Sequence, residues 1–218
     1  MKFLPSLSLA ALFLAGTAAQ AQSINNGSFE SGSYRVQGVI GGWSTTAYMS
    51  TVSAADLVAD RATGMTASPV GGNMMAAWYL TVGTPTLSQT LSGLTPGKNY
   101  NISFYESTAN TSPDAYAASL QWLVSLGSQT LGGTAMQAAA PHSGAAWKKV
   151  NLTFTANMAT ETLKFVASAT APLAPEPLML LDGITISAVP EPSTAALSLA
   201  GLGLFGFLLS RRRSARQV

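Results

Sequence analysis

Polar and apolar residues alternate in several short stretches of the chain. Between Asn99 and Tyr105, the apolar side chains of Tyr100, Ile102 and Phe104 alternate with polar ones. A period of two residues with one apolar face is typical of a half-buried antiparallel strand. The same pattern predicts further strands over residues 120–126, 150–155 and 163–167.

Other stretches are apolar without alternation. Residues 73–82 and 178–187 suit buried strands, the second interrupted by Asp182-Gly183. Shorter strands are predicted within residues 25–32, 87–91 and 129–131. Pro96-Gly97 fits the centre of a type II turn, and Gly127-Ser128 fits a two-residue hairpin turn.

Short strands at intervals of about 8 to 15 residues, with Gly and Pro turns and little helix, indicate an all-β fold. We expect a two-sheet antiparallel β-sandwich, and at this length a jelly roll rather than an immunoglobulin-like sandwich. Residues 45–69 have the weakest pattern, and within them residues 56–61 fit either a short helix or a loop.

The two ends of the chain differ from the body. Lys2, an apolar segment over residues 3–15 and Ala19-Gln20-Ala21 predict a signal peptide over residues 1–21. At the other end, the uncharged run 193–209 would span roughly 25 Å as a helix, near the lower limit for a transmembrane helix. The predicted organisation is a signal peptide (1–21), a sandwich domain (22–188) and a tail (189–218).

The tail has three ordered parts. Val189-Pro190-Glu191-Pro192 precedes the apolar run, and Arg211-Arg212-Arg213 follows it. Clustered Arg residues favour the cytoplasmic side, so the body should lie outside. This order resembles the PEP-CTERM sorting signal, which implies export, transient inner-membrane retention and handling by an exosortase in a Gram-negative, exopolysaccharide-secreting bacterium. A plain C-terminal membrane anchor is the alternative.

Charge and titratable groups narrow the function. The net charge of +2 comes from the two ends, because residues 22–189 hold six basic and eight acidic side chains, without the Lys/Arg clusters of a nucleic-acid-binding protein. The chain has no cysteine and one histidine, His142, which excludes thiol nucleophiles and multi-histidine zinc sites. Asp56 and Asp60 are the candidate acid pair of a glycan hydrolase, although solvated carboxylates are the simpler interpretation.

Three landmarks of the body occur in a suggestive order. They are Asn26–Glu30, Leu87–Leu91 followed by Pro96–Phe104, and Leu181–Ile186. Together they resemble the choice-of-anchor C family and related galactose-binding-like jelly rolls, which are similar to many carbohydrate-binding modules. The resemblance implies a structural calcium, a cation that needs six to eight oxygen ligands. Its ligands would be the carboxylates of Glu30 and Asp182 and backbone carbonyls near Asn26 and Ser28. Alternatively, Asp182 caps a turn and Glu30 is solvated.

Sugar recognition needs exposed aromatic rings beside amide groups. We expect Trp43 and Trp122 in the core. The predicted ligand surface is Tyr105, Tyr79 and Asn101.

The sequence therefore predicts an exported, non-enzymatic protein of the cell surface or exopolysaccharide matrix. The sandwich would bind glycan or adhere, with exosortase, polysaccharide and transiently the inner membrane as partners. A purely structural, self-associating surface protein without a sugar site is the alternative, and a glycan hydrolase is a further one.

Overall fold

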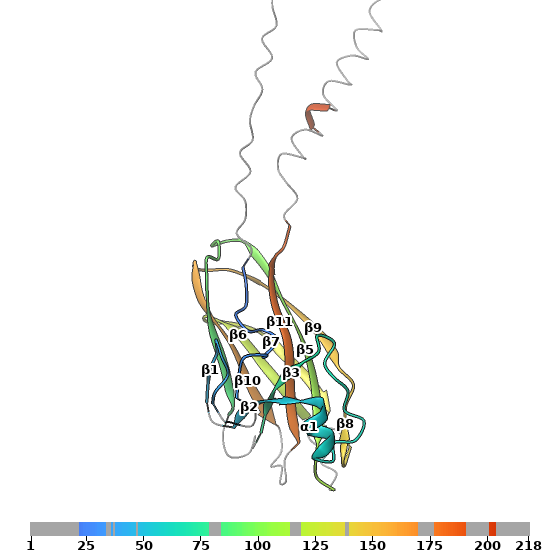
Figure 1. Cartoon of the computed structure of the whole chain (residues 1–218). Coiled ribbons are helices and arrows are strands. Elements are labelled where there is room, and N and C mark those ends of the chain that lie inside the picture. The colour runs from blue at the N-terminus through green and yellow to red at the C-terminus, as the bar shows by residue number, and fades with distance from the viewer. Residues whose placement is uncertain are drawn as a thin grey trace, which may run out of the picture.

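The computed structural model describes residues 22–33, 36, 38–46, 48–78, 84–113, 119–137, 140–169, 177–190 and 201–203. These residues form two antiparallel sheets that face each other, which confirms the predicted all-β, two-sheet sandwich (Figure 1). Within this part of the chain, no helix is long and apolar enough to cross a membrane. The predicted signal peptide and most of the predicted span lie outside the described residues, as do Tyr79, Glu191, Pro192 and Arg211–Arg213.

One sheet has five strands. In spatial order they are β1 (Ser44–Thr45), β4 (Thr86–Ser92), β10 (Thr160–Ala169), β6 (Ser119–Leu126) and β7 (Gln129–Gln137). Strands β6 and β7 form the expected hairpin, because Leu126 pairs with Gln129 and Gly127 takes a φ of 53°.

The other sheet has six strands. The order is β2 (Met49–Ser53), β3 (Asn73–Ala77), β11 (Leu178–Ala188) and β5 (Asn99–Asn110), with β8 (Ser143–Gly144) and β9 (Lys148–Thr155) both paired to β5. The predicted turn before β5 is present, since Lys98 N donates to Thr95 O at 3.1 Å and Gly97 has a φ of 82°.

The main core lies between the sheets and is built around Phe165. Its ring contacts those of Phe104, Trp43 and Trp122 at centroid distances of 5.2, 6.4 and 6.4 Å. Trp43 and Trp122 are 7% and 0% exposed, so the prediction that both lie in the core is confirmed.

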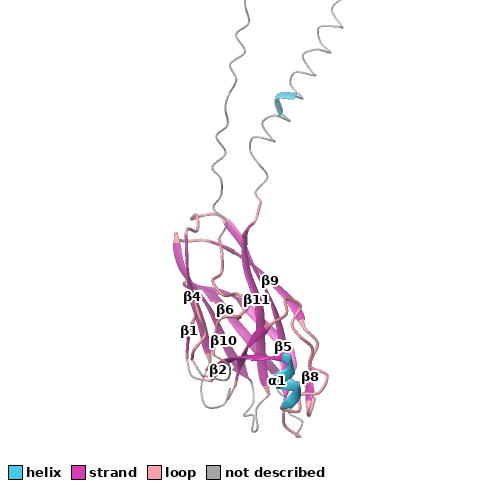
Figure 2. Cartoon of the chain, viewed as in Figure 1, coloured by secondary structure: helices cyan, strands magenta, loops and turns pink. Residues whose placement is uncertain are grey.

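A second, smaller core lies on the outer face of the six-stranded sheet. There α1 (Ala54–Ala59) and the loop after it lie on the sheet (Figure 2). Leu57 of the helix belongs to one buried cluster with Met74 of β3 and Leu180 of β11, so the helix and loop cover these two strands. Both faces of these two strands are therefore buried, which explains their continuous apolar sequence. The helix begins at Ala54, earlier than the segment considered from the sequence, because Ser53 and Asp56 form a capping box.

The structure also differs from the predicted strands. Residues 25–28 form a turn, but the short strand expected within 25–32 is missing, because Gly32 makes only an isolated bridge with Ile40. The cause is the backbone of Phe29, which has a φ of 55° and donates to Asn26 O. Strand β3 ends at Ala77, and β1, β2 and β8 were not predicted.

Candidate functional site

The outer face of β11, β5 and β9 is open beyond the area that α1 covers. Side chains at alternate positions of these three strands point outward, because Ile102, Phe104 and Phe154 at the intervening positions belong to the main core. We call this surface the amide face. It comprises Asn99, Asn101, Ser103, Tyr105, Lys149, Asn151, Thr153, Thr155, Thr185 and Ser187.

Tyr105 lies where the amide face meets the loop that follows α1, residues 60–72, which we call the covering loop. It is half-buried and pairs with Asp182 on one side and Lys149 on the other. The ammonium of Lys149 lies 5.6 Å from the centre of the tyrosine ring. On the β11 side the packing is close, since a Cβ added to Gly183 would fall 3.1 Å from both Tyr105 Cδ2 and Val70 Cγ1. Tyr105 is therefore a partly open aromatic ring held between two strands.

Hydrogen bonds between neighbouring strands order the rest of the amide face. Ser103 Oγ and Thr185 Oγ1 lie 2.8 Å apart, and Thr155 Oγ1 donates to Asn99 Oδ1 at 2.7 Å. Asn101 is half-buried between these pairs. The structure thus places the predicted residues Tyr105 and Asn101 on one face, about 13 Å apart at the usual rise of a strand.

The opening turn of the body lies against β11. Ile184 N donates to Gly27 O at 2.9 Å. A Cβ at Gly27 would fall 2.1 Å from the backbone oxygen of Ile184, so only glycine fits this approach. The contact brings Glu30 towards Asp182. Glu30 Oε1 accepts from Asn73 N at 3.0 Å and passes over Gly72, where a Cβ would lie 1.9 Å from it.

Asp182 is fully buried under the covering loop. Its Oδ1 accepts from Gly183 N at 2.7 Å, whereas Oδ2 has no hydrogen-bond partner among the described residues. Burial raises the pKa of Asp182 to about 7, and the negative charge of Glu30 adds to the rise, while the Ser68 side chain and the Gly183 N–H oppose it. The site therefore brings two carboxyl groups together, and the buried one holds its proton more strongly than an exposed aspartate does.

The oxygen donors of this site match calcium chemistry in part. An unpartnered buried carboxylate oxygen beside a second carboxylate is a reasonable start to a hard-cation site. Glu30 and Asp182 fit that role, and Ser28 lies half-buried in the same turn. No group of three or more acidic or histidine side chains that could hold a metal occurs in the described ranges. Calcium binding stays a prediction that rests on Glu30 and Asp182.

Asn26 shapes the opening turn, and the expected contribution of the backbone near it to a calcium site stays a prediction. Its side chain donates to Ser31 O and Gly41 O, both at 2.7 Å, and accepts from Ser31 N. Its carbonyl accepts from Phe29 N and from Trp43 Nε1. Because these bonds use both lone pairs of the carbonyl, Asn26 serves to shape the opening turn.

Glu106 is a buried acid that the sequence reasoning missed. It is fully buried, and neither carboxylate oxygen has a hydrogen-bond partner within the described part of the chain. Burial raises its pKa, against the lowering effects of Thr134 and of Lys148, whose Nζ lies 3.7 Å from Oε1. The signal was available, since position 106 continues the inward series of Ile102 and Phe104.

The titratable groups considered for catalysis have structural roles. Asp56 accepts from Ser53 N at 2.8 Å in the capping box, and Asp60 is the C-cap of the same helix. His142 lies in a loop, where its carbonyl accepts from Thr63 N at 2.9 Å and its own N–H donates to Ser112 O.

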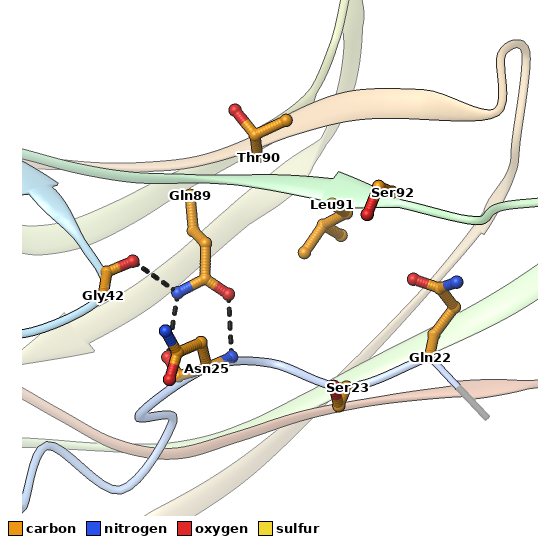
Figure 3. A pocket seen from close by; sticks show the side chains of 8 residues that line it. All are labelled: Gln22, Ser23, Asn25, Gly42, Gln89, Thr90, Leu91 and Ser92. Carbon is orange, nitrogen blue, oxygen red and sulfur yellow. Dashed lines mark hydrogen bonds between the residues drawn. The ribbon is translucent and has the colours of Figure 1, made fainter.

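A polar pocket of about 390 Å³ lies between the N-terminal segment and β4 (Figure 3). The side chain of Gln89 points into the protein, and both its amide nitrogen and its amide oxygen form hydrogen bonds there. Gln89 Nε2 donates to Asn25 O and Gly42 O at 2.8 and 2.7 Å, and its Oε1 accepts from Asn25 N at 2.9 Å. The described residues that line this pocket include no aromatic side chain.

Comparisons with known proteins agree with these features. Residues 188–213 match the family model described as the PEP-CTERM protein-sorting motif, which confirms the predicted resemblance of the tail. The motif indicates an exported protein that an exosortase processes at the membrane. No curated protein matches the chain.

The fold is similar to that of several solved structures. The Stig cyclase Fisc from Fischerella sp. TAU, in complex with (3Z)-3-(1-methyl-2-pyrrolidinylidene)-3H-indole, has a TM-score of 0.54 at 16% identity, over 78% of this chain and 98% of that chain. An apo cyclase from Fischerella sp. has a TM-score of 0.54 at 14% identity, over 79% and 98%. TmCBM61 in complex with beta-1,4-galactotriose has a TM-score of 0.48 at 13% identity, over 77% and 99%. Such low identities concern the fold alone.

Proposed function

We propose that this exported protein binds glycan through its amide face and catalyses no reaction. It would act at the cell surface or in the exopolysaccharide matrix of a Gram-negative bacterium. The observation that carries the proposal is the open row of amide and hydroxyl groups on β5, β9 and β11 beside the half-buried ring of Tyr105.

The chemistry of the face suits a sugar polymer. Pyranose rings present C–H groups that pack on an aromatic ring, and their hydroxyl groups exchange hydrogen bonds with amides. Tyr105 and Asn101 supply these two kinds of contact on one extended surface. A flat row along the strands suits a chain of sugars, whereas the pocket beside Gln89 has neither a ring nor a free amide group on that residue.

A calcium ion at Glu30 and Asp182 would support this surface. It would neutralise the two carboxylates and fix the covering loop, whose Val70 adjoins Gly183 beside Tyr105. Calcium would therefore hold the ring in place and would not contact the sugar.

The test uses the full chain in detergent and polysaccharide isolated from the producing cells. Electrophoresis through gels that contain this polysaccharide should retard the wild type. Tyr105→Ala should raise the dissociation constant derived from this retardation about tenfold, because loss of a central aromatic contact typically costs more than 1 kcal/mol. Tyr105→Phe should keep most of the binding.

Leu123→Ala is the matched control, since Leu123 is an exposed apolar side chain on the opposite sheet, 38% exposed. Equal retardation of the wild type and Tyr105→Ala would contradict the proposed site. No retardation of any variant, together with self-association at rising concentration, would favour the purely structural alternative.

A further inference from the structure

The sorting motif begins before the folded body ends. The matched motif starts at residue 188, and Ala188 is the last residue of β11, paired with Tyr100. The next residue is also attached to the sheet, because Val189 N donates to Asn99 O at 2.8 Å. Pro190 therefore directly follows a residue that the sandwich holds.

The chain leaves little room between the sandwich and the membrane. The apolar run predicted to enter the membrane begins at Ser193, four residues after Val189. A fully extended chain covers at most about 14 Å over that distance. An enzyme that reaches Pro190 and the following residues in this gap must lie against the end of the sandwich.

Two connected loops form this end of the sandwich. We call it the tether end and define it as residues 93–98 and 156–159. Backbone hydrogen bonds join its loops: Gly97 N donates to Ala156 O at 2.8 Å, and Leu94 N donates to Ala159 O at 3.0 Å. The start of the described body lies here too, since a Cβ at Gly93 would fall 2.7 Å from Gln22 Nε2. In Figure 1 the first described residues, in blue, and the end of β11, in red, lie at the same end of the sandwich.

The tether end presents an apolar side chain and a basic one. Met158 is 59% exposed, and Lys98 is exposed in the neighbouring turn. The nearby acid is turned inward, because Glu161 is 4% exposed and its Oε1 accepts from the N–H groups of Asn157 and Met158 at 3.0 and 3.1 Å. The carboxylate of Glu161 therefore fixes the backbone of the loop from which Met158 projects.

From this geometry we infer that the tether end is a contact surface for the membrane-bound exosortase, with Met158 as its apolar contact. The enzyme then recognises the folded body together with the motif in the tail. This inference does not depend on glycan binding, and it adds a second recognition element to the established sorting motif.

The experiment follows release of the full chain from the membrane by pulse-chase in cells that contain the exosortase. Met158→Glu and Met158→Lys should each slow release roughly fivefold, as expected for loss of an interface contact worth about 1 kcal/mol. Leu123→Glu is the control, because Leu123 is an exposed apolar residue in β6, outside the tether end. It should leave the rate of release unchanged.

A spacer separates contact from misfolding. The spacer is ten Gly and Ser residues followed by a second copy of Ala188-Val189, inserted after Val189, so that the matched motif stays unbroken. The enzyme can then reach the motif without touching the body, and the Met158 variants should be released at the rate of their spacer parent. Unchanged release of both Met158 variants at native length would overturn the inference. Equal slowing with and without the spacer would also overturn it.

Discussion

The two outer faces of the sandwich are similar in composition but differ in what surrounds them. The outer face of β4, β10 and β6 is here called the hydroxyl face, and it comprises Ser88, Thr90, Gln121, Leu123, Ser125, Thr162, Lys164 and Val166. Each face carries one lysine among small polar groups. Among the described residues, only the amide face contains an aromatic ring, Tyr105, and only its sheet is partly covered by a helix and a loop.

This difference shows why polar composition does not by itself mark a binding surface. Lys164 lies between Ser88 and Ser125 in an open face without an aromatic ring among its residues. The Nζ of Lys149 lies 5.6 Å from the centre of the Tyr105 ring, and Tyr105 is paired on its other side with the buried Asp182. The ring of Tyr105 and the covering helix and loop distinguish the two faces. The predictions below test both features.

The largest expected effect concerns α1 and the covering loop, which bury part of the outer face of the six-stranded sheet. Leu57 is fully buried between α1 and the six-stranded sheet, so Leu57→Ala should lower the free energy of unfolding by about 2 to 5 kcal/mol. Val58→Ala on the exposed side of the helix, and Leu123→Ala on the hydroxyl face, should each change it by less than about 0.5 kcal/mol. Urea unfolding measures all three, and a loss below about 1 kcal/mol for Leu57→Ala would mean that α1 and the covering loop are loosely attached.

The next effect concerns Asp182 in calcium-free protein. Its pKa is raised to about 7 from an ordinary value of 3.8, so the folded state favours the protonated acid. The contribution of Asp182 to the free energy of unfolding is therefore fully present below pH 3.8 and is lost as the pH rises through 7. The loss is roughly 4 kcal/mol at most.

Urea unfolding in the presence of a chelator, from pH 4 to 8, measures this contribution. It is the difference in the free energy of unfolding between the wild type and Asp182→Asn. Wild-type protein should lose stability relative to the variant as the pH rises, and added calcium should restore it at pH 8. Thr162→Ala on the hydroxyl face should follow the wild type. A difference that stays constant with pH would show that Asp182 is ionised throughout.

The smallest effect concerns a single amide. Asn101→Ala should weaken binding of the isolated polysaccharide about threefold, the effect of one hydrogen bond worth somewhat under 1 kcal/mol. Ser88→Ala on the hydroxyl face should leave binding unchanged. Equal losses for both variants in gel retardation would remove the distinction between the faces.

Local pattern predicted much of the fold because it reports burial directly. The alternation of Tyr100, Ile102 and Phe104 gave the strand and its two faces, and Pro96-Gly97 gave the turn before it. The same alternation placed Tyr105 and Asn101 together on the outer face.

The missed elements depend on contacts between distant parts of the chain. Strand β2 was missed, and a helix was left open only for residues 56–61, because β2 and α1 bury their apolar side chains against β3 and β11, which lie far away in sequence. No local period therefore marks them. The role of Asn26 could not be read either, because its partners Gly41 and Trp43 are set by a loop closure. Glu106 could have been found, since a polar residue at an inward position is a readable exception.

The central claim is that the amide face binds glycan, and a binding map tests it most directly. Isotope-labelled protein would be titrated with oligosaccharides from partial hydrolysis of the producing cells' polysaccharide, and backbone amide signals would be followed by NMR. Shifts confined to residues 99–105, 149–155 and 185–187 are predicted. Shifts centred on β4, β10 and β6, or no shifts at saturating oligosaccharide, would contradict the claim.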